Sequence, residues 1–124
     1  MIIGRKRSST KAEKDRLQAT LDYAISVIKK SKLSGYVSAL YLYGSCARNT
    51  QKITSDVDLL LELNDKIDIA EYTEEIRKLK SEIIPLTDDL MDIDLAVVIG
   101  DTWKTNKMLY YSQIKKEGKN IWIP

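Results

Sequence analysis

The sequence of 124 residues contains no histidine and a single cysteine, Cys46. Without histidine, the chain cannot assemble a Ser-His-Asp or Cys-His catalytic group. A structural zinc site needs several cysteine or histidine ligands and is excluded as well. One cysteine cannot form an intramolecular disulfide, which favours a reducing compartment, and we expect a cytoplasmic protein. Any chemistry must therefore rely on carboxylates, hydroxyls, amines or a hard metal ion.

The sequence also lacks a long apolar run and a marked excess of charge of one sign. No apolar stretch approaches the length of a membrane span, and no apolar segment follows the basic N-terminal residues, so neither a membrane span nor a signal peptide is expected. The formal net charge is only +2, which gives no argument for nucleic acid binding. The length and the 44% of hydrophobic residues predict one globular domain over 1–124, with a flexible start at 1–9.

Hydrophobic periodicity predicts a first helix over residues 11–33. Thr10 and Glu13 have the spacing of a capping box at its start, and Gly35 is expected to end it. Two strands are predicted next, over 36–43 and 56–63, because both segments are apolar and short. The polar residues between them predict a loop or one short helical turn.

The second half of the chain predicts a helix, a strand and a final helix. The residues expected on one face of this second helix are Ile69, Tyr72, Ile76, Leu79 and Ile83, and Pro85 would end it. A strand over 90–98 and a helix over 106–117 follow, the latter ended by Gly118. Residues 121–123 are expected to dock as a short extended tail. This order predicts a small α/β (α+β) domain, with a small mixed sheet flanked by helices.

Two carboxylates open the second predicted strand, where a purely structural protein would not place them. Asp is disfavoured in strands, yet Asp56 and Asp58 are followed by three leucines. Residues two apart in a strand point to the same face, so these like charges lie side by side. A hard divalent cation would relieve the repulsion. Asp-x-Asp is also common on solvated strand faces, so the pair alone does not establish a metal site.

The third predicted strand repeats the pattern with Asp92 and Asp94. If the two strands are neighbours, three or four carboxylates converge on one patch. Such a patch suits one or two Mg²⁺ ions, the arrangement used in phosphoryl and nucleotidyl transfer. A calcium loop is the rival interpretation, but the Asp/Asn-rich loop with its central Gly and closing Glu is absent from the sequence.

A second motif precedes the carboxylate pair at a fixed distance. Residues 40–45 read Leu-Tyr-Leu-Tyr-Gly-Ser, and ten residues separate Ser45 from Asp56. This combination resembles the signature of the DNA polymerase β-like nucleotidyltransferase superfamily. Residues 44–48 (Gly-Ser-Cys-Ala-Arg) and 114–118 (Ile-Lys-Lys-Glu-Gly) are similar to segments of its minimal nucleotidyltransferases, often the antitoxin partners of helical HEPN toxins.

The resemblance implies a role for each residue of the motifs. Gly44 would let the backbone approach the nucleotide phosphates, and Ser45 would offer them its hydroxyl and N–H. Asp56 and Asp58 would hold Mg²⁺ on the triphosphate. Asp94 would be the third carboxylate, which also binds metal and helps to deprotonate the attacking group.

Other residues near these motifs have more than one interpretation. Asp92 shares the face of Asp94 and is the alternative third carboxylate. Arg48 would pair with a nucleotide phosphate or, equally well, form a structural salt bridge on the loop. Cys46 is interpreted as a small packing residue, since no base is available to activate it. Tyr43 is interpreted as strand packing rather than as a base-stacking group.

The implied reaction is transfer of a nucleoside monophosphate, AMP from ATP, to an acceptor hydroxyl. In the antitoxin subgroup the acceptor lies on the partner toxin, so the resemblance implies a helical HEPN-type partner. The short chain suggests that a second protein, or a second copy, completes the substrate site. A binding module of the same fold with little or no activity is the alternative. An antibiotic-modifying nucleotidyltransferase is less compatible, because such enzymes generally carry an added helical domain.

Overall fold

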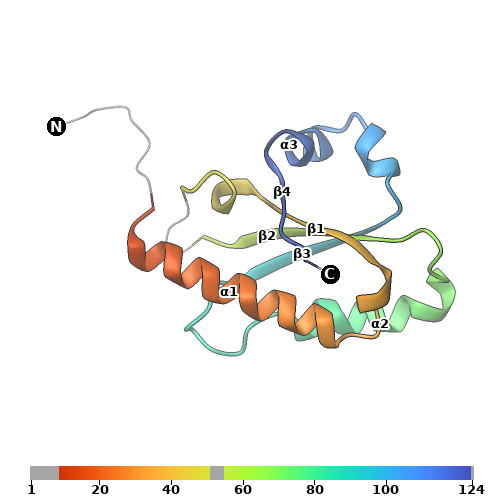
Figure 1. The fold of residues 1–124 in the computed structure, drawn as a ribbon, viewed down its shortest axis with the longest axis horizontal. Coiled ribbons are helices and arrows are strands. Elements are labelled where there is room, and N and C mark those ends of the chain that lie inside the picture. Colours follow the sequence, from red (N-terminus) through yellow and green to blue (C-terminus); the bar gives the residue numbers. More distant parts are fainter. Residues whose placement is uncertain (1–8, 51–54, 124) are drawn as a thin grey trace.

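The computed structural model describes residues 9–50 and 55–123, and it shows a mixed four-stranded sheet between helices (Figure 1). Its elements are α1 (Lys11–Lys30), η1 (Ser34–Tyr36), β1 (Val37–Tyr43), η2 (Gly44–Cys46), β2 (Val57–Leu63), α2 (Ile69–Glu82), β3 (Ile93–Ile99), η3 (Thr102–Thr105), α3 (Leu109–Glu117) and β4 (Lys119–Asn120). The strand order is β3-β2-β1-β4, with β2 and β3 parallel and the other pairs antiparallel. The predicted fold class is confirmed.

The first helix begins as predicted but ends earlier. The Thr10 hydroxyl accepts a hydrogen bond from the Glu13 N–H at 3.2 Å, and Glu13 Oε1 accepts one from the Thr10 N–H at 2.8 Å. This reciprocal pair is the predicted capping box. The prediction that Gly35 ends the helix was wrong, because the backbone already leaves the helical region at Ser31 (ψ 152°) and Gly35 lies in the separate turn η1.

The second helix also departs from its predicted apolar face. Leu79 and Ile83 are buried as expected, but Ile69 is 52% exposed. Ile69 is the first residue of α2, so it lies at the end of the helix where the core layer has not begun. The helix ends at Glu82, ahead of Pro85. Proline therefore follows the helix end, as its missing N–H and fixed φ require.

The later elements begin a few residues away from their predicted starts. β3 begins at Ile93 rather than at residue 90, and α3 begins at Leu109 rather than at residue 106. The expected tail at 121–123 is preceded by β4, which pairs with β1. Ile121 and Trp122 pack against the core, whereas Ile123 is 73% exposed. The prediction for 1–9 lies outside the described residues except at Ser9, which is buried. No helix in the described segments is long and apolar enough to cross a membrane.

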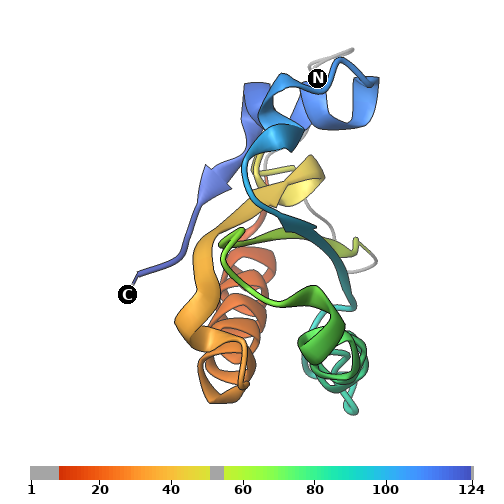
Figure 2. The ribbon, with the colours of Figure 1, turned by 90° about the vertical axis from the view of Figure 1, so that its right-hand side faces the viewer.

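The sheet separates two apolar layers (Figure 2). Figure 2 shows α1 and α2 on one side of the sheet and α3 on the other. The larger layer lies against α1 and α2, and its strand residues include Leu40, Leu42, Leu59, Leu61, Leu63, Ile93 and Leu95. The smaller layer lies against α3 and η3 and contains Leu60, Trp103 and Ile114. Because side chains alternate along a strand, Asp58 and Asp94 share the smaller layer's face.

A polar anchor on α1 fixes the loop that leads into β3. Arg16 Nη2 donates hydrogen bonds to the carbonyls of Asp88 and Leu90, at 3.0 and 3.1 Å. The buried Thr20 hydroxyl accepts a hydrogen bond from the Met91 N–H at 3.0 Å. The first helix therefore sets the point at which the chain enters the third strand, immediately before the carboxylates of that strand.

Candidate active site

The register of β2 and β3 brings the predicted carboxylates into two adjacent rows. Asp58 is the direct register partner of Asp94 across these parallel strands. One step earlier, the Val57 N–H donates to the Asp92 carbonyl at 2.8 Å, which holds Asp92 beside Asp56. All four predicted carboxylates thus lie at one end of the two strands.

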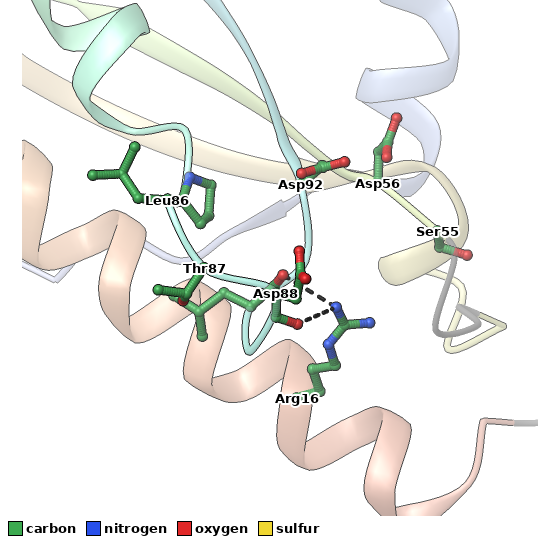
Figure 3. A pocket seen from close by; sticks show the side chains of 9 residues that line it. Arg16, Ser55, Asp56, Leu86, Thr87, Asp88 and Asp92 are labelled. Carbon is green, nitrogen blue, oxygen red and sulfur yellow. Dashed lines mark hydrogen bonds between the residues drawn. The ribbon is translucent and has the colours of Figure 1, made fainter.

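A shallow cleft lies beside Asp56 and Asp92 (Figure 3). Its volume is about 170 Å³, and it is lined by Arg16, Ser55, Asp56, Pro85, Leu86, Thr87, Asp88, Leu90 and Asp92. Pockets for drug-sized ligands usually measure roughly 300–1,000 Å³. This cleft is therefore too small to enclose a nucleotide by itself. It borders the row of Asp56 and Asp92, whereas Asp58 and Asp94 face α3.

The turn after β1 lies directly against Asp58. β1 and β2 are antiparallel, and Tyr43 is the register partner of Asp58, so Gly44 and Ser45 follow at the same end of the sheet. Gly44 has φ +77°, and a Cβ on it would lie 2.5 Å from Asp58 Oδ2. Glycine is needed here both for the left-handed backbone and for the close approach of the carboxylate. The two motifs that are separate in the sequence form one site.

Asp58 is held in an unfavourable electrostatic environment. Burial raises the pKa of the Asp58 carboxyl, and the neighbouring charges of Asp94 and Asp56 raise it further, while Arg48 lowers it. A raised carboxyl pKa means that the ionised form is less stable in the folded protein than in water. The pair of Asp58 and Asp94 therefore destabilises the fold unless a cation neutralises it.

Glu62, a second carboxylate on the same strand, has partners that compensate its charge. Glu62 is buried on the same face of β2 as Asp58, and it accepts a 2.7 Å hydrogen bond from Trp103 Nε1. Its Oε1 also lies 3.6 Å from Lys104 Nζ. In the described part of the chain, Asp58 forms no salt bridge of this kind. The two carboxylates of this strand face therefore differ in environment, because Glu62 has a cationic partner and a hydrogen-bond donor, whereas the neighbouring charges of Asp94 and Asp56 oppose the charge of Asp58.

The donor set fits a magnesium ion that is shared with a phosphate. Among the described residues, no three acidic, cysteine or histidine side chains are close enough together to hold a metal. The sequence predicted that Asp56, Asp58 and Asp94 converge on one metal-binding patch, but in the described residues they do not form a three-ligand site built from protein groups alone. Mg²⁺ commonly takes one or two carboxylates and completes its shell with water and substrate phosphates. Adjacent carboxylates beside a bare glycine backbone match that pattern.

Arg48 forms an ion pair with the end of α3. Arg48 Nη1 donates to Glu117 Oε1 at 2.9 Å and to Oε2 at 3.1 Å. Glu117 Oε1 also accepts a 3.3 Å hydrogen bond from the Gly44 N–H. Of the two roles open to Arg48, the structural salt bridge is the one present. Glu117 was not predicted as a site residue, and no local pattern links it to an arginine 69 residues away.

A tyrosine pair adjoins Asp58 on the α3 side. The hydroxyls of Tyr43 and Tyr110 are 2.7 Å apart, and their rings meet edge to face. Burial raises the pKa of Tyr43, with further contributions from Tyr110, Asp58 and Asp94. Tyr43 therefore remains a neutral hydroxyl beside the carboxylates. The interpretation of Tyr43 as strand packing was incomplete, because the residue also borders the acidic site.

Cys46 is a packing residue, as interpreted. It is buried, and its Sγ lies 3.5 Å from the Asp56 carbonyl oxygen, close enough for a weak hydrogen bond. Burial raises the pKa of the Cys46 thiol to about 11, and the charges of Asp58 and Asp56 add to the effect. The thiolate is the nucleophilic form of cysteine, so Cys46 is not a nucleophile at neutral pH.

We expect Gly44→Ala to lower the free energy of unfolding by about 1–2 kcal/mol. An alanine is unfavourable in the left-handed backbone conformation, and its Cβ would clash with the Asp58 carboxylate. Urea unfolding followed by circular dichroism measures the change. Gly35→Ala is the matched control, since Gly35 has no positive φ and nothing lies within 4 Å of its added Cβ. Equal losses in the two variants would contradict this account of Gly44.

We expect Asp58→Asn to raise the melting temperature at pH 7 by a few degrees. The folded-state pKa of Asp58 is raised, so its destabilising effect is fully present above that pKa and is lost as the pH falls from it to the lower pKa of the unfolded chain. The stability gain of the variant should therefore disappear in acid. Asp22→Asn, an exposed change on α1, should show no such gain. A less stable Asp58→Asn protein at pH 7 would refute the prediction.

Comparison with known proteins extends these observations. The family model described as a nucleotidyltransferase domain matches residues 25–120. No curated protein matches the chain. A candidate nucleotidyltransferase from Sulfolobus solfataricus has a TM-score of 0.59 and 17% identity, covering 98% of this chain and 92% of its own.

Two further solved structures share the fold. A toxin–antitoxin protein solved with AMP-PNP has a TM-score of 0.51 and 23% identity, with 83% of this chain and 73% of that chain covered. The spectinomycin adenyltransferase AAD(9) from Enterococcus faecialis, solved with ATP and spectinomycin, has a TM-score of 0.53 and 16% identity, with 86% and 56% covered. The family match spans all four strands together with the Gly44 turn and the paired carboxylates, and the chain belongs to the nucleotidyltransferase domain family.

Proposed function

We propose that the protein transfers a nucleoside monophosphate, AMP from ATP, to an acceptor hydroxyl in a magnesium-dependent reaction. The observation that carries the proposal is the pairing of Asp58 with Asp94 directly beside the Gly44 turn. A protein with only a structural role would be more stable without these like charges. The choice of AMP and ATP is supported by two proteins of the same fold, one solved with AMP-PNP and the other with ATP.

Each site residue has a role in this proposal. The bare backbone of Gly44 lets the phosphates approach, and Ser45 donates its hydroxyl and N–H to them. Asp56 and Asp58 would hold Mg²⁺, which neutralises the charge of the triphosphate. Asp94 lies next to Asp58 on the edge strand β3, where it accepts the proton of the attacking hydroxyl. The acceptor oxygen then bonds to the α-phosphorus, and pyrophosphate leaves.

Asp92 is the alternative proton acceptor, and its position differs from that of Asp94. Asp92 lines the cleft together with Asp56, whereas Asp94 lies on the face covered by α3. Asp94 is the better candidate because it is the direct register partner of Asp58, one of the two residues that would hold the metal.

We place the acceptor hydroxyl on a partner protein, a helical HEPN-type toxin, or on a second copy of the chain. The cleft beside Asp56 measures only about 170 Å³, which leaves the acceptor side of the site open. Met108 and Leu109, at the start of α3, are 62% and 75% exposed. They precede Tyr110, whose hydroxyl is 2.7 Å from that of Tyr43, so apolar surface for a macromolecular acceptor is available at the end of α3 that contacts Tyr43. The reaction would take place in the cytoplasm.

The proposal predicts label transfer from ATP that carries a radioactive α-phosphate. With Mg²⁺ and a co-expressed helical HEPN-type partner, the wild-type chain should label that partner. Asp58→Asn should reduce the label to background, and Asp94→Asn should slow transfer by about a hundredfold or more. Asp22→Asn, which removes an exposed charge far along α1, should transfer normally.

The same experiment separates the enzyme from a binding module. In cells, the wild type and Asp58→Asn would neutralise the partner's toxicity equally well if the chain acted only by covering its partner. That result, together with the absence of label, would overturn the proposed activity. Loss of both label and protection in Asp58→Asn, with an unchanged or higher melting temperature, would support it.

A further inference from the structure

The carboxylate of Glu117 accepts hydrogen bonds from two donors, the Gly44 N–H and the Arg48 guanidinium. One of its oxygens accepts hydrogen bonds from the Gly44 N–H, at 3.3 Å, and from Arg48 Nη1, at 2.9 Å. The other oxygen accepts from the same Arg48 nitrogen at 3.1 Å. A backbone N–H at a glycine turn and an arginine are the donors that bind phosphate oxygens in many proteins. The Glu117 carboxylate is therefore already bound to the donors that a phosphate would use.

The position of Glu117 is fixed by the end of α3 before it and by the turn into β4 after it. It is the last residue of α3, where the partial negative charge of the helix end disfavours a carboxylate. The next residue, Gly118, donates to the Ile114 carbonyl at 2.7 Å, and a Cβ on Gly118 would lie 2.5 Å from that oxygen. The chain then enters β4, where Lys119 pairs with Leu42 of β1. This tight turn holds Glu117 above the loop that follows β1.

We infer that Glu117 is an internal occupant of the phosphate subsite, which a bound nucleotide displaces from Gly44 and Arg48; this inference rests on the proposed function. Carboxylate and phosphate oxygens bind the same donors, arginine N–H and backbone N–H groups. The Gly44 N–H has one hydrogen and cannot serve both anions. A carboxylate retained beside a triphosphate would also repel it. Glu117 therefore weakens nucleotide binding and favours release.

The exposure of the pair is consistent with such an exchange. The side chains of Arg48 and Glu117 are 45% and 23% exposed, so neither is locked in the core. Separation of the pair leaves α3 attached, because Ile114 remains buried against the sheet. The exchange requires side-chain rotation only, without unfolding of the helix.

The test is the dissociation constant of AMP-PNP with Mg²⁺, measured by calorimetry on the full chain. Glu117→Gln keeps the shape of the side chain and removes its charge, and we expect binding to tighten about three- to tenfold. The melting temperature without nucleotide should fall slightly, because the ion pair is weakened. Tighter nucleotide binding together with lower stability is the result expected if Glu117 occupies the subsite. Mutation of a residue that merely supports the site would lower both the affinity and the stability.

Glu74→Gln is the control for net charge. Glu74 pairs with Arg77 on the exposed surface of α2, with 2.6 Å between their charged atoms, and α2 packs on the opposite face of the sheet. Equal tightening in this control would overturn the inference, as would unchanged or weaker binding by Glu117→Gln while the wild type binds normally. If neither the wild type nor Glu117→Gln binds AMP-PNP, the proposed nucleotide function fails and the inference fails with it.

Discussion

The pairing of Asp58 with Asp94 across β2 and β3 is the constraint around which the rest of the site is arranged. The two carboxylates repel each other, yet they are register partners because β2 and β3 pair in parallel. A shift of one residue would turn Leu59 and Leu95 out of the core and the carboxylates into it. The apolar layer against α1 and α2 therefore holds the charges together. The antiparallel pairing of β1 on the other side of β2 adds Gly44 to the same point.

The sequence predicted those features that depend on local patterns. Strand alternation placed both carboxylates on one face, and the order of elements followed from hydrophobic periodicity. That β2 and β3 are neighbours had to be assumed, because pairing joins residues that are far apart in the chain. Two local predictions were wrong. Gly35 was expected to end the first helix, but that helix already ends before Ser31. Ile69 has the spacing of a buried position, but it is the first residue of α2 and is 52% exposed.

The contacts that α3 contributes to the site had no signal in the sequence. Tyr43 and Tyr110 meet across 67 residues, and Arg48 and Glu117 across 69. Both contacts exist because the chain returns along β1 as β4 after α3. That topology is decided by tertiary packing, and a two-residue strand gives no periodic pattern from which to predict it. The family resemblance included Glu117 within residues 114–118 but gave it no role, and its contacts with Gly44 and Arg48 came only from the structure.

The helix α3 touches the site at its two ends and is held at its centre. Near its start, Tyr110 meets Tyr43 beside the carboxylates, and at its end Glu117 meets Gly44. Between them, Ile114 is buried against the sheet. Polar contacts at the ends exchange readily with ligand oxygens, whereas an apolar contact at the centre does not. The proposed nucleotide would therefore replace the protein's own carboxylate at Gly44 and Arg48, while the apolar contacts of the sheet and α3 keep Asp58 and Asp94 in register.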